Sequence, residues 1–421
     1  MVQNAILRGH SSRLGTEQGL SAHEDRDRAA GGDGEPTSRH LQQVTVEFEY
    51  PVYFTRDAFA PANPCLREAI ATREPWRRHR LFAVIDRNVA LASPWLVGAI
   101  HAYVERHHDA LELVAEPLVL EGGEAAKNDT AVATRLHTRW NELGMDRQSV
   151  IVIVGGGALL DLAGYAAAVA HRGLRVVRLP TSVLAQADSG VGVKCGVNLF
   201  GKKNFVGTFA PPFGVVNDGR FLETLAARDV VAGMAEAVKV ALIRDGDFFA
   251  WLVAHADELA ACALGPLGEL IQRCAALHLR HIATSGDPFE LGSARPLDFG
   301  HWAAHKLEAM TRHRLRHGEA VAIGLAIDAT YAERSGLCDA ATAASVRALL
   351  GRLGLPLWDE ALAQTAGGRR VVLDGLAEFR EHLGGELTIT LLRRIGEGVE
   401  VHEIRESLME DAIARLVPAR Q

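Results

Sequence analysis

Short apolar segments alternate with longer amphipathic ones in the first half of the chain. Residues 81–85 and 176–179 are apolar runs, residues 149–154 are a continuous β-branched run, and residues 44–50 alternate apolar and polar side chains. Between these strand-like runs lie helical patterns over residues 94–106, 129–143 and 158–171. Apolar strands that alternate with helices are typical of a parallel sheet buried on both faces. The pattern therefore predicts an α/β domain whose first strand covers residues 44–50.

Helical patterns dominate beyond residue 218. They cover residues 228–243, 247–261, 267–284, 300–311, 319–335 and 340–350, and strand-like sequence returns only at residues 387–392. The polar, glycine-dotted residues 1–43 are expected to form a disordered extension. We therefore expect three parts, with a ligand cleft between the second and the third. They are the extension (1–43), an α/β domain (44–218) and a mostly helical domain (219–421).

Composition and charge exclude several classes of protein. Of the 421 residues, 48% are hydrophobic and 23% charged, which is the balance of a soluble globular protein and not of a fibrous or disordered chain. Lys and Arg number 45 against 52 Asp and Glu, a net charge of −7, so no basic field favours nucleic acid or an anionic membrane. No apolar run is long enough to span a bilayer, the first residues lack a signal-peptide core, and the five cysteines include no CxxC pair. We expect a cytoplasmic protein without nucleic-acid or membrane partners.

A glycine-rich turn follows the β-branched strand. Residues 155–157 are all glycine, and Asp161 lies one turn into the helix that follows. Glycine lets the backbone approach a pyrophosphate at a helix N-terminus, although a tight strand-to-helix turn alone would also need it. The last glycine of a full GxGxxG is missing, which weakens the motif. Asp86 and the pair Thr181 and Ser182 follow other strands, and this recurrence at strand ends favours nucleotide binding.

Acidic and imidazole side chains in the helical half suggest a metal site. His301 and His305 are four residues apart and share one helix face, His317 starts the next helical pattern, and Glu236 and Lys239 share a face of an apolar helix. Such a set suits a divalent ion, with Zn²⁺ favoured by imidazole. In a chain with 18 histidines, the same spacing also fits a plain polar helix face. Charges within apolar sequence are costly unless paired, which favours the functional interpretation.

Six segments, taken together in their order and spacing, carry a resemblance to a known family. They are GGGALLDLAG (155–164), LPTSVLAQADSGVGVKCGVN (179–198), GKKNFVGTFAPP (201–212), GMAEAVKVAL (233–242), DFGHWAAH (298–305) and HGEAVAIG (317–324). From about residue 44 onward the chain resembles the sugar phosphate cyclases, of which 3-dehydroquinate synthase is the best known. The resemblance implies a Rossmann-like NAD-binding α/β domain followed by a helical metal-binding domain. It also implies a reaction in which NAD⁺ is regenerated while a sugar phosphate is oxidised, loses phosphate, is reduced and closes by aldol addition.

Matching positions imply roles for individual residues. The metal ligands, for Zn²⁺ or Co²⁺, would be Glu236, His301 and His317. The catalytic residues would be Asp188, Lys239, Asp298 and His305. The substrate-binding residues would be Arg172, Lys194, Lys203, Asn204, Arg280, Arg295 and His382, and because Arg172 matches an arginine that reaches into the neighbouring subunit, a homodimer is expected. The NAD-binding residues would be Asp86, Asn88, Glu124, Lys127, Gly156, Gly157, Asp161, Thr181, Ser182 and Thr224.

Several positions depart from the dehydroquinate synthase pattern. Asp298 replaces an asparagine, Ala294 replaces an arginine that helps to hold the substrate carboxylate, and Arg295 is displaced from that arginine by one residue. Arg280 and His382 replace lysines. A carboxylate at position 298 would repel an acidic substrate and accept hydrogen bonds from a neutral polyol. These features resemble the cyclases that act on sedoheptulose 7-phosphate, so we expect that substrate and a valiolone-type cyclitol as product.

Three alternatives stay open. His305 is retained here but altered in the 2-epi-5-epi-valiolone synthases, so the match to that subgroup is incomplete, and Arg280 would let the protein act as a 3-dehydroquinate synthase if its guanidinium reached the carboxylate. A metal-dependent polyol dehydrogenase of the same fold would release NADH, but such enzymes usually carry aspartate where Glu236 stands. A non-catalytic binding protein would have little need for an intact set of Glu236, Lys239, His301 and His317.

Overall fold

The computed structural model describes residues 39–285, 289, 296–382 and 385–418. The chain divides into two units, Met1–Glu47 and Phe48–Gln421, and the helices and strands of the described residues all belong to the second. Most of the extension expected at residues 1–43 lies outside the described residues, as does Arg295. The backbone of His382 is described, at the end of a helix, but its side chain is not.

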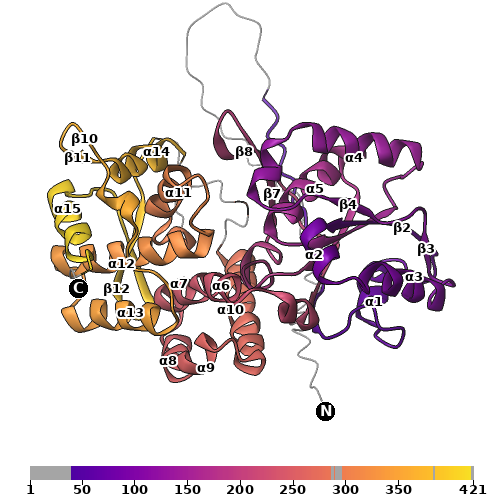
Figure 1. The fold of residues 1–421 in the computed structure, drawn as a ribbon. Coiled ribbons are helices and arrows are strands. Elements are labelled where there is room, and N and C mark those ends of the chain that lie inside the picture. The colour runs from indigo at the N-terminus through magenta and orange to yellow at the C-terminus, as the bar shows by residue number, and fades with distance from the viewer. Residues whose placement is uncertain (1–38, 286–288, 290–295, 383–384, 419–421) are drawn as a thin grey trace, which may run out of the picture. The chain divides into compact units, whose positions relative to one another are not determined.

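Seven parallel strands form the main sheet (Figure 1). Its order is β1–β9–β6–β5–β2–β3, and β4 also pairs with β2. The strands are β1 (Val52–Thr55), β2 (His79–Asp86), β3 (Leu111–Leu113), β4 (Leu118–Leu120), β5 (Val150–Gly155), β6 (Arg175–Pro180) and β9 (Gly214–Asp218). Because all of them are parallel, their carboxyl ends meet at one edge of the sheet, which is where ligands bind in such folds.

Both faces of this sheet are covered by helices. Leu81, Ala83 and Ile85 of β2 pack into a core with α1 and α3, whereas Phe82 and Val84 pack into another with α4 and α5. The helices of this half are α1 (Cys65–Ala71), α2 (Arg87–Ala92), α3 (Leu96–Arg106), α4 (Ala131–Glu142) and α5 (Gly157–Val169). Successive side chains of a strand point to opposite faces, so a strand between two helix layers must be apolar throughout. The predicted α/β sheet is confirmed.

The prediction of a strand at residues 44–50 is wrong. These residues form no strand, and β1 begins at Val52. The carbonyl oxygen of Pro51 accepts a hydrogen bond from the Val215 amide at 2.9 Å, which opens the ladder with β9. Proline has no N–H group to donate, so the ladder does not continue upstream of it.

An antiparallel hairpin that was not expected follows β6. It consists of β7 (Lys194–Leu199) and β8 (Lys202–Phe209). A π-helical turn, Ala185–Ser189, precedes it. The hairpin carries three of the predicted substrate-binding residues, Lys194, Lys203 and Asn204.

The second half is mostly helical and surrounds one buried helix. The helices are α6 (Ala227–Gly233), α7 (Ala235–Arg244), α8 (Gly246–Ala254), α9 (Ala256–Ala260), α10 (Leu264–Thr284), α11 (His301–Met310), α12 (His317–Ser335), α13 (Ala340–Arg352), α14 (Asp374–His382) and α15 (Glu406–Arg415). Helix α12 is buried along nearly its whole length, because its residues are small or apolar on every side. The strand predicted at residues 387–392 corresponds to β12 (Ile389–Arg394), which pairs with β13 (Glu397–Val401). Within the described part of the chain, no helix is long and apolar enough to cross a membrane.

Candidate metal and nucleotide sites

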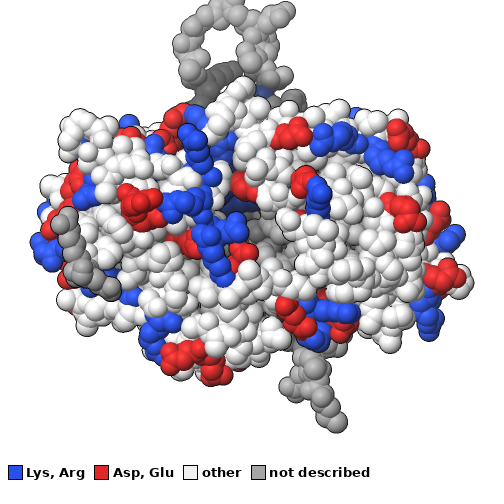
Figure 2. All heavy atoms as spheres, in the orientation of Figure 1, with Lys and Arg blue, Asp and Glu red and all other residues white. Residues whose placement is uncertain are grey.

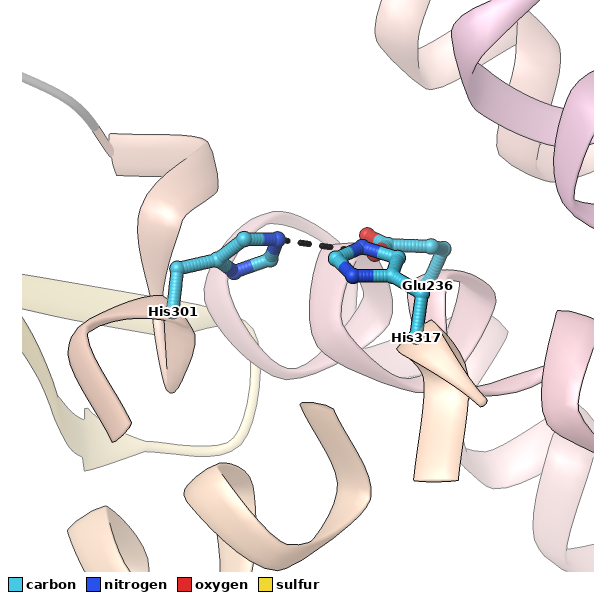
Figure 3. A group of neighbouring side chains, drawn as sticks. All are labelled: Glu236, His301 and His317. Carbon is cyan, nitrogen blue, oxygen red and sulfur yellow. Dashed lines mark hydrogen bonds and ion pairs between the residues drawn. The ribbon is translucent and has the colours of Figure 1, made fainter. Parts of the chain in front are cut away.

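Three helices begin at the same place in the helical half. Glu236 is the second residue of α7, and His301 and His317 are the first residues of α11 and α12. Each offers one ligand atom, and these atoms all lie within 4.8 Å of one another. Figure 3 shows the three side chains facing a common point, His301 from one side and the other two from the opposite side. The structure thus brings the three predicted metal ligands together.

Two glycines of α12 allow these helix starts to meet. A Cβ atom on Gly324 would lie 2.0 Å from the carbonyl oxygen of Gly300, the residue before His301. A Cβ atom on Gly318 would lie 1.7 Å from the carbonyl oxygen of Ala232, near the end of α6. Atoms cannot approach so closely, so only glycine lets α12 touch α11 and α6 at these points. Backbone packing, and not only the ligands themselves, therefore sets the geometry of the cluster.

Both histidines turn the same ring nitrogen toward Glu236. The Nδ1 of His301 lies 3.1 Å from the carbonyl oxygen of Phe299, and the Nδ1 of His317 lies 3.1 Å from Glu308 Oε2. Carbonyl and carboxylate oxygens only accept, so Nδ1 carries the proton in each ring. The Nε2 atoms of His301 and His317 then lie 3.5 Å and 3.2 Å from Glu236 Oε1. Such partners at the far nitrogen are the usual support of a metal-binding histidine.

Spacing and charge in this cluster fit a divalent metal ion. Tetrahedral zinc bonds of about 2.0–2.1 Å place neighbouring ligand atoms about 3.3 Å apart. The Nε2–Oε1 separations of 3.2 Å and 3.5 Å are close to that value. Burial lowers the pKa of His317, but the carboxylates of Glu308 and Glu236 together outweigh it and raise this pKa to about 9, so positive charge is favoured here. Two imidazoles and one carboxylate also leave a coordination position for substrate.

A buried lysine connects the cluster to Asp188. Lys239 is 3% exposed; its Nζ forms an ion pair with Glu236 Oε2 and lies 3.8 Å from Asp188 Oδ2. Burial lowers the pKa of Lys239, but the charges of Glu236 and Asp188 outweigh it and hold this pKa above its usual value. Burial raises the pKa of Glu236, whereas Lys239 and His301 lower it to well below the usual range. Each buried charge therefore depends on its neighbours.

His278 lies next to Asp188 and Arg178 binds the segment after it, and neither residue was predicted. The Nδ1 of His278, on α10, lies 3.2 Å from Asp188 Oδ1. Arg178, 2% exposed, donates hydrogen bonds to the carbonyl oxygens of Gly190 and Gly192 in the segment after Asp188. A signal for His278 existed, because it continues the apolar face of α10 at helical spacing from the buried Cys274. Arg178 had none, because its partners are backbone atoms.

The other two predicted catalytic residues also lie near this cluster. The His305 ring is exposed, with its centroid 5.4 Å from that of His301 and 6.3 Å from that of His317. Asp298 is half-buried, and its charge adds to the effects that raise the pKa of Lys239. Both side chains therefore border the space in front of the metal-ligand candidates.

Two of the predicted substrate-binding residues, both on β8, form part-buried polar contacts. Lys203 Nζ lies 3.0 Å from both carboxylate oxygens of Glu308. The Oδ1 atom of Asn204 accepts a hydrogen bond from Lys127 Nζ, and the backbone amide of Asn204 donates one to Asn198 Oδ1 at 2.8 Å. The hairpin is thereby connected both to the metal-ligand candidates and to the predicted nucleotide residues.

Three other predicted substrate-binding residues are exposed: Lys194, Arg172 and Arg280. Arg172 stands in left-handed backbone conformation at φ 62°. Figure 2 shows a hollow near the middle of one face, with lysine and arginine side chains at its border. The contacts within the described residues do not bring Arg172 or Arg280 to the metal-ligand candidates.

Predicted nucleotide residues gather at the carboxyl edge of the sheet. Asp86 ends β2, is 6% exposed, and accepts a hydrogen bond from the Asn88 amide at 2.8 Å. Gly156 precedes α5, and Ser182 Oγ would lie 3.9 Å from a Cβ placed on it. A Cβ on Gly122 would lie 1.8 Å from Asp86 Oδ2, so this glycine, which was not predicted, leaves the room that the carboxylate occupies. The edge therefore combines an acid with open backbone at a helix N-terminus, which suits ribose and pyrophosphate.

A second group of predicted nucleotide residues is bound together by one buried lysine. Lys127, 1% exposed, lies 2.7 Å from Asp161 Oδ2 and 3.6 Å from Glu124 Oε1. Glu124 also accepts a hydrogen bond from Asn198 at 3.0 Å. Thr181 follows β6, and its amide donates to the Gly155 carbonyl at 3.1 Å. Thr224 donates to the Phe221 carbonyl at 2.8 Å, and no contact joins it to the others in the described part of the structure.

Two family models match consecutive parts of the chain. The model described as 3-dehydroquinate synthase N-terminal matches residues 117–232, and that described as 3-dehydroquinate synthase C-terminal matches residues 233–369. A 3-dehydroquinate synthase of Rhodopseudomonas palustris (strain BisB18) is 33% identical over 387 residues, which are 89% of this chain and 97% of the relative. The chain belongs to the 3-dehydroquinate synthase family. The resemblance to sugar phosphate cyclases found in the sequence is thereby confirmed.

The chain is also similar to proteins that are named valiolone synthases. A 2-epi-valiolone synthase of Actinosynnema mirum is 34% identical over 300 residues, 70% of this chain and 77% of the relative. The solved structure of ValA, a 2-epi-5-epi-valiolone synthase of Streptomyces hygroscopicus subsp. jinggangensis 5008 with NAD⁺ and Zn²⁺ bound, has a TM-score of 0.78 at 28% identity. The match covers 90% of this chain and 99% of the ValA chain. The predicted fold class, an α/β half followed by a helical half, is confirmed.

Proposed function

We propose that this protein is a sugar phosphate cyclase that uses bound NAD⁺ and a Zn²⁺ or Co²⁺ ion to convert sedoheptulose 7-phosphate into a valiolone-type cyclitol. The observation that carries the proposal is the convergence of Glu236, His301 and His317 next to the buried pair of Lys239 and Asp188. Family membership supports the cyclase reaction, and the NAD⁺ and Zn²⁺ in ValA support the cofactors.

The two cofactors would bind at separate places. Glu236, His301 and His317 would hold the metal through one oxygen and two Nε2 atoms. Asp86 would accept hydrogen bonds from a ribose, and the backbone around Gly156 would bind the pyrophosphate. When bound, NAD⁺ accepts and returns a hydride, and the metal ion polarises an oxygen of the substrate.

The remaining residues hold the substrate and move its protons. The ammonium of Lys239 can donate hydrogen bonds to substrate hydroxyls, because two carboxylates keep it protonated. The Asp188 carboxylate is held by Lys239 and His278, and it can accept a hydroxyl proton. Lys203 and His305 would bind the phosphate group, for which a lysine provides a point charge. Burial of Lys239 strengthens its interactions.

Substrate choice rests on the charge of Asp298. A half-buried carboxylate that lies close enough to Lys239 to affect its pKa would oppose a second carboxylate on the substrate. A repulsive neighbour together with a missing charge-assisted bond corresponds to about 100-fold in selectivity. The 2-epi-valiolone synthase relative supports a polyol substrate, whereas the dehydroquinate synthase relative supports the acid. The second candidate function is therefore 3-dehydroquinate synthase, with Arg280 as the carboxylate-binding residue.

Incubation with each substrate separates the candidates. The protein with NAD⁺ and Zn²⁺ is given sedoheptulose 7-phosphate or the acidic precursor of dehydroquinate, phosphate release is measured, and products are identified by NMR. We expect kcat/KM for phosphate release to be at least about 100-fold higher with sedoheptulose 7-phosphate than with the acidic precursor, and we expect no net formation of NADH. Preference for the acid would show a dehydroquinate synthase, and net NADH would show a polyol dehydrogenase.

We also propose a homodimer in which Arg172 enters the partner's site. The exposed side chain of Arg172 supports this proposal. Sedimentation should give the mass of a dimer, and Arg172→Ala should raise KM for the phosphate substrate. A fully active monomer would contradict it.

A further inference from the structure

Glu308 is a buried acid that lies between His317, a metal-ligand candidate, and Lys203, a predicted substrate-binding residue. It stands on α11 and is 3% exposed. Its Oε2 atom lies 3.1 Å from Nδ1 of His317, and both its oxygens lie 3.0 Å from Nζ of Lys203. The same carboxylate therefore contacts α12 in the helical half and β8 of the hairpin.

His317 differs from His301 in what supports it. The Nδ1 proton of His301 goes to a neutral backbone carbonyl, that of Phe299, whereas the Nδ1 proton of His317 goes to the charged carboxylate of Glu308. A charged acceptor fixes the ring orientation more firmly and makes the other nitrogen a stronger donor to a metal. Glu308 thus acts on one of the two imidazoles.

Lys203 is held in place by the same group. Its side chain is 26% exposed, whereas that of Glu308 is 5% exposed, so the ammonium covers the carboxylate and keeps an open side. An ammonium has three donors, and the remaining N–H groups can bind an anionic group of the substrate. Glu308 therefore determines where this positive charge stands relative to His317.

A neighbouring ion pair shows what a purely structural contact looks like. Lys202, the residue before Lys203, pairs with Glu381 of α14 at 2.8 Å, also between the hairpin and the helical half. Both of these side chains are exposed, at 56% and 71%, and neither is hydrogen-bonded to a metal-ligand candidate in the described residues. This pair joins the same two parts of the chain and so provides a matched control.

We propose that Glu308 is a positioning residue that orients His317 for the metal ion and holds Lys203 for the phosphate group of the substrate. One carboxylate thereby sets the spacing between the metal and the phosphate-binding charge. The inference rests on the proposed function and extends it to a residue that contacts neither cofactor nor reacting atoms.

The first test measures metal affinity. The full chain with NAD⁺ is titrated with Zn²⁺ against a chromogenic chelator, and Co²⁺ is used for its visible absorption spectrum. Glu308→Gln keeps the size of the side chain but loses its charge, and it should weaken metal binding about 10- to 100-fold and change the Co²⁺ spectrum. Lys203→Met should leave metal affinity within about threefold of the wild type, because the bond from Glu308 to His317 remains.

The second test measures KM and kcat with sedoheptulose 7-phosphate at saturating metal. Lys203→Met and Glu308→Gln should both raise KM, and the double variant should have no higher KM than the worse single one, since both act on the same contact. The controls Lys202→Met and Glu381→Gln should change neither metal affinity nor KM. If Glu308→Gln fails to fold, Glu308→Asp takes its place, with a smaller loss of metal affinity expected because Asp keeps the negative charge, although it reaches less far toward His317.

The outcomes distinguish the inference from the proposed function. Wild-type metal affinity and an unchanged Co²⁺ spectrum in the folded Glu308 variant would overturn the inference while leaving the cyclase function intact. Equal effects of the Glu308 and Glu381 variants would also overturn it, because the contact would then be only structural. A wild-type protein that binds no Zn²⁺ and releases no phosphate from either substrate would instead overturn the proposed function.

Discussion

The carboxyl edge of the sheet and the metal-ligand cluster of the helical half differ in the kinds of residues and contacts that form them. At the edge, the residues proposed for the ribose and the pyrophosphate, Asp86 and Gly156, come from a strand end and from glycine backbone, and Asp86 is supported by a local bond to Asn88. In the cluster, side chains from three helices meet, and Glu236 and Lys239 are buried as charges. The edge therefore depends mainly on local chain geometry, and the cluster depends on long-range packing.

This difference predicts which site is the more fragile. A buried charge that loses its partner is strongly destabilising, whereas an open glycine turn holds no such charge. The helical cluster should accordingly lose both binding and stability when it is altered, while the sheet edge should lose binding with little change in stability. The following substitutions test that contrast, from the largest expected effect to the smallest.

The largest effect is expected from Glu236→Ala. It removes a metal-ligand candidate and leaves the buried Lys239 without its closest partner, so metal content and activity should fall more than about 100-fold. The free energy of unfolding should also fall by about 3 kcal/mol or more. His301→Ala should lose metal as well, but with a smaller loss of stability, because it leaves no unpaired charge. Metal analysis and chemical denaturation measure both quantities, and equal stability losses in the two variants would contradict this account.

A second test alters the packing without touching a ligand. Gly324→Ala places a methyl group against the Gly300 carbonyl, so α12 must move away from α11. We expect about tenfold weaker metal binding and a loss of about 1–3 kcal/mol in stability. Gly351→Ala on the neighbouring helix α13 is the control, since nothing lies within 4 Å of a Cβ added there. The control should be neutral or slightly stabilising, and an unchanged metal affinity in Gly324→Ala would remove the role given to packing.

The corresponding test at the sheet edge is Gly122→Ala. The new methyl group would displace the Asp86 carboxylate, which should weaken NAD⁺ binding about tenfold. Zn²⁺ affinity should stay at the wild-type value. Gly98→Ala, where nothing lies within 4 Å, is the control and should leave both affinities unchanged. Fluorescence titration with NADH measures the first affinity, and a joint loss of NAD⁺ and Zn²⁺ binding would show that the two sites are not independent.

The smallest effect is expected at Asp298. Asp298→Asn removes a negative charge from a half-buried position, worth about 1 kcal/mol against an acidic substrate. The ratio of kcat/KM for the acid to that for sedoheptulose 7-phosphate should therefore rise about fivefold. Metal affinity should not change. An unchanged ratio would show that substrate choice is made by another residue, with Arg280 the first to test.

Local patterns predicted the parts of this protein that depend on neighbours in the chain. The β-branched run at β5 and the glycine turn after it were recognisable because a strand buried on both faces must be apolar throughout. The helices that begin near His301 and His317 were recognisable from helical patterns at residues 300–311 and 319–335. The alternation of apolar and polar residues at 44–50 gave a wrong prediction, because it does not indicate whether a partner strand is present. In the structure, the ladder with β9 ends at Pro51.

Tertiary structure alone decided which charged groups meet. Glu308 lies 105 residues from Lys203, and His278 lies 90 residues from Asp188, so no periodicity of either segment could have paired them. The residue types of the metal cluster and the family motifs were present in the sequence, but the approach of α12 to α11 at Gly324 was not. Sequence determines which side chains are available, and packing of backbone against backbone determines which of them share a site, because that contact depends on distances of a few tenths of an ångström.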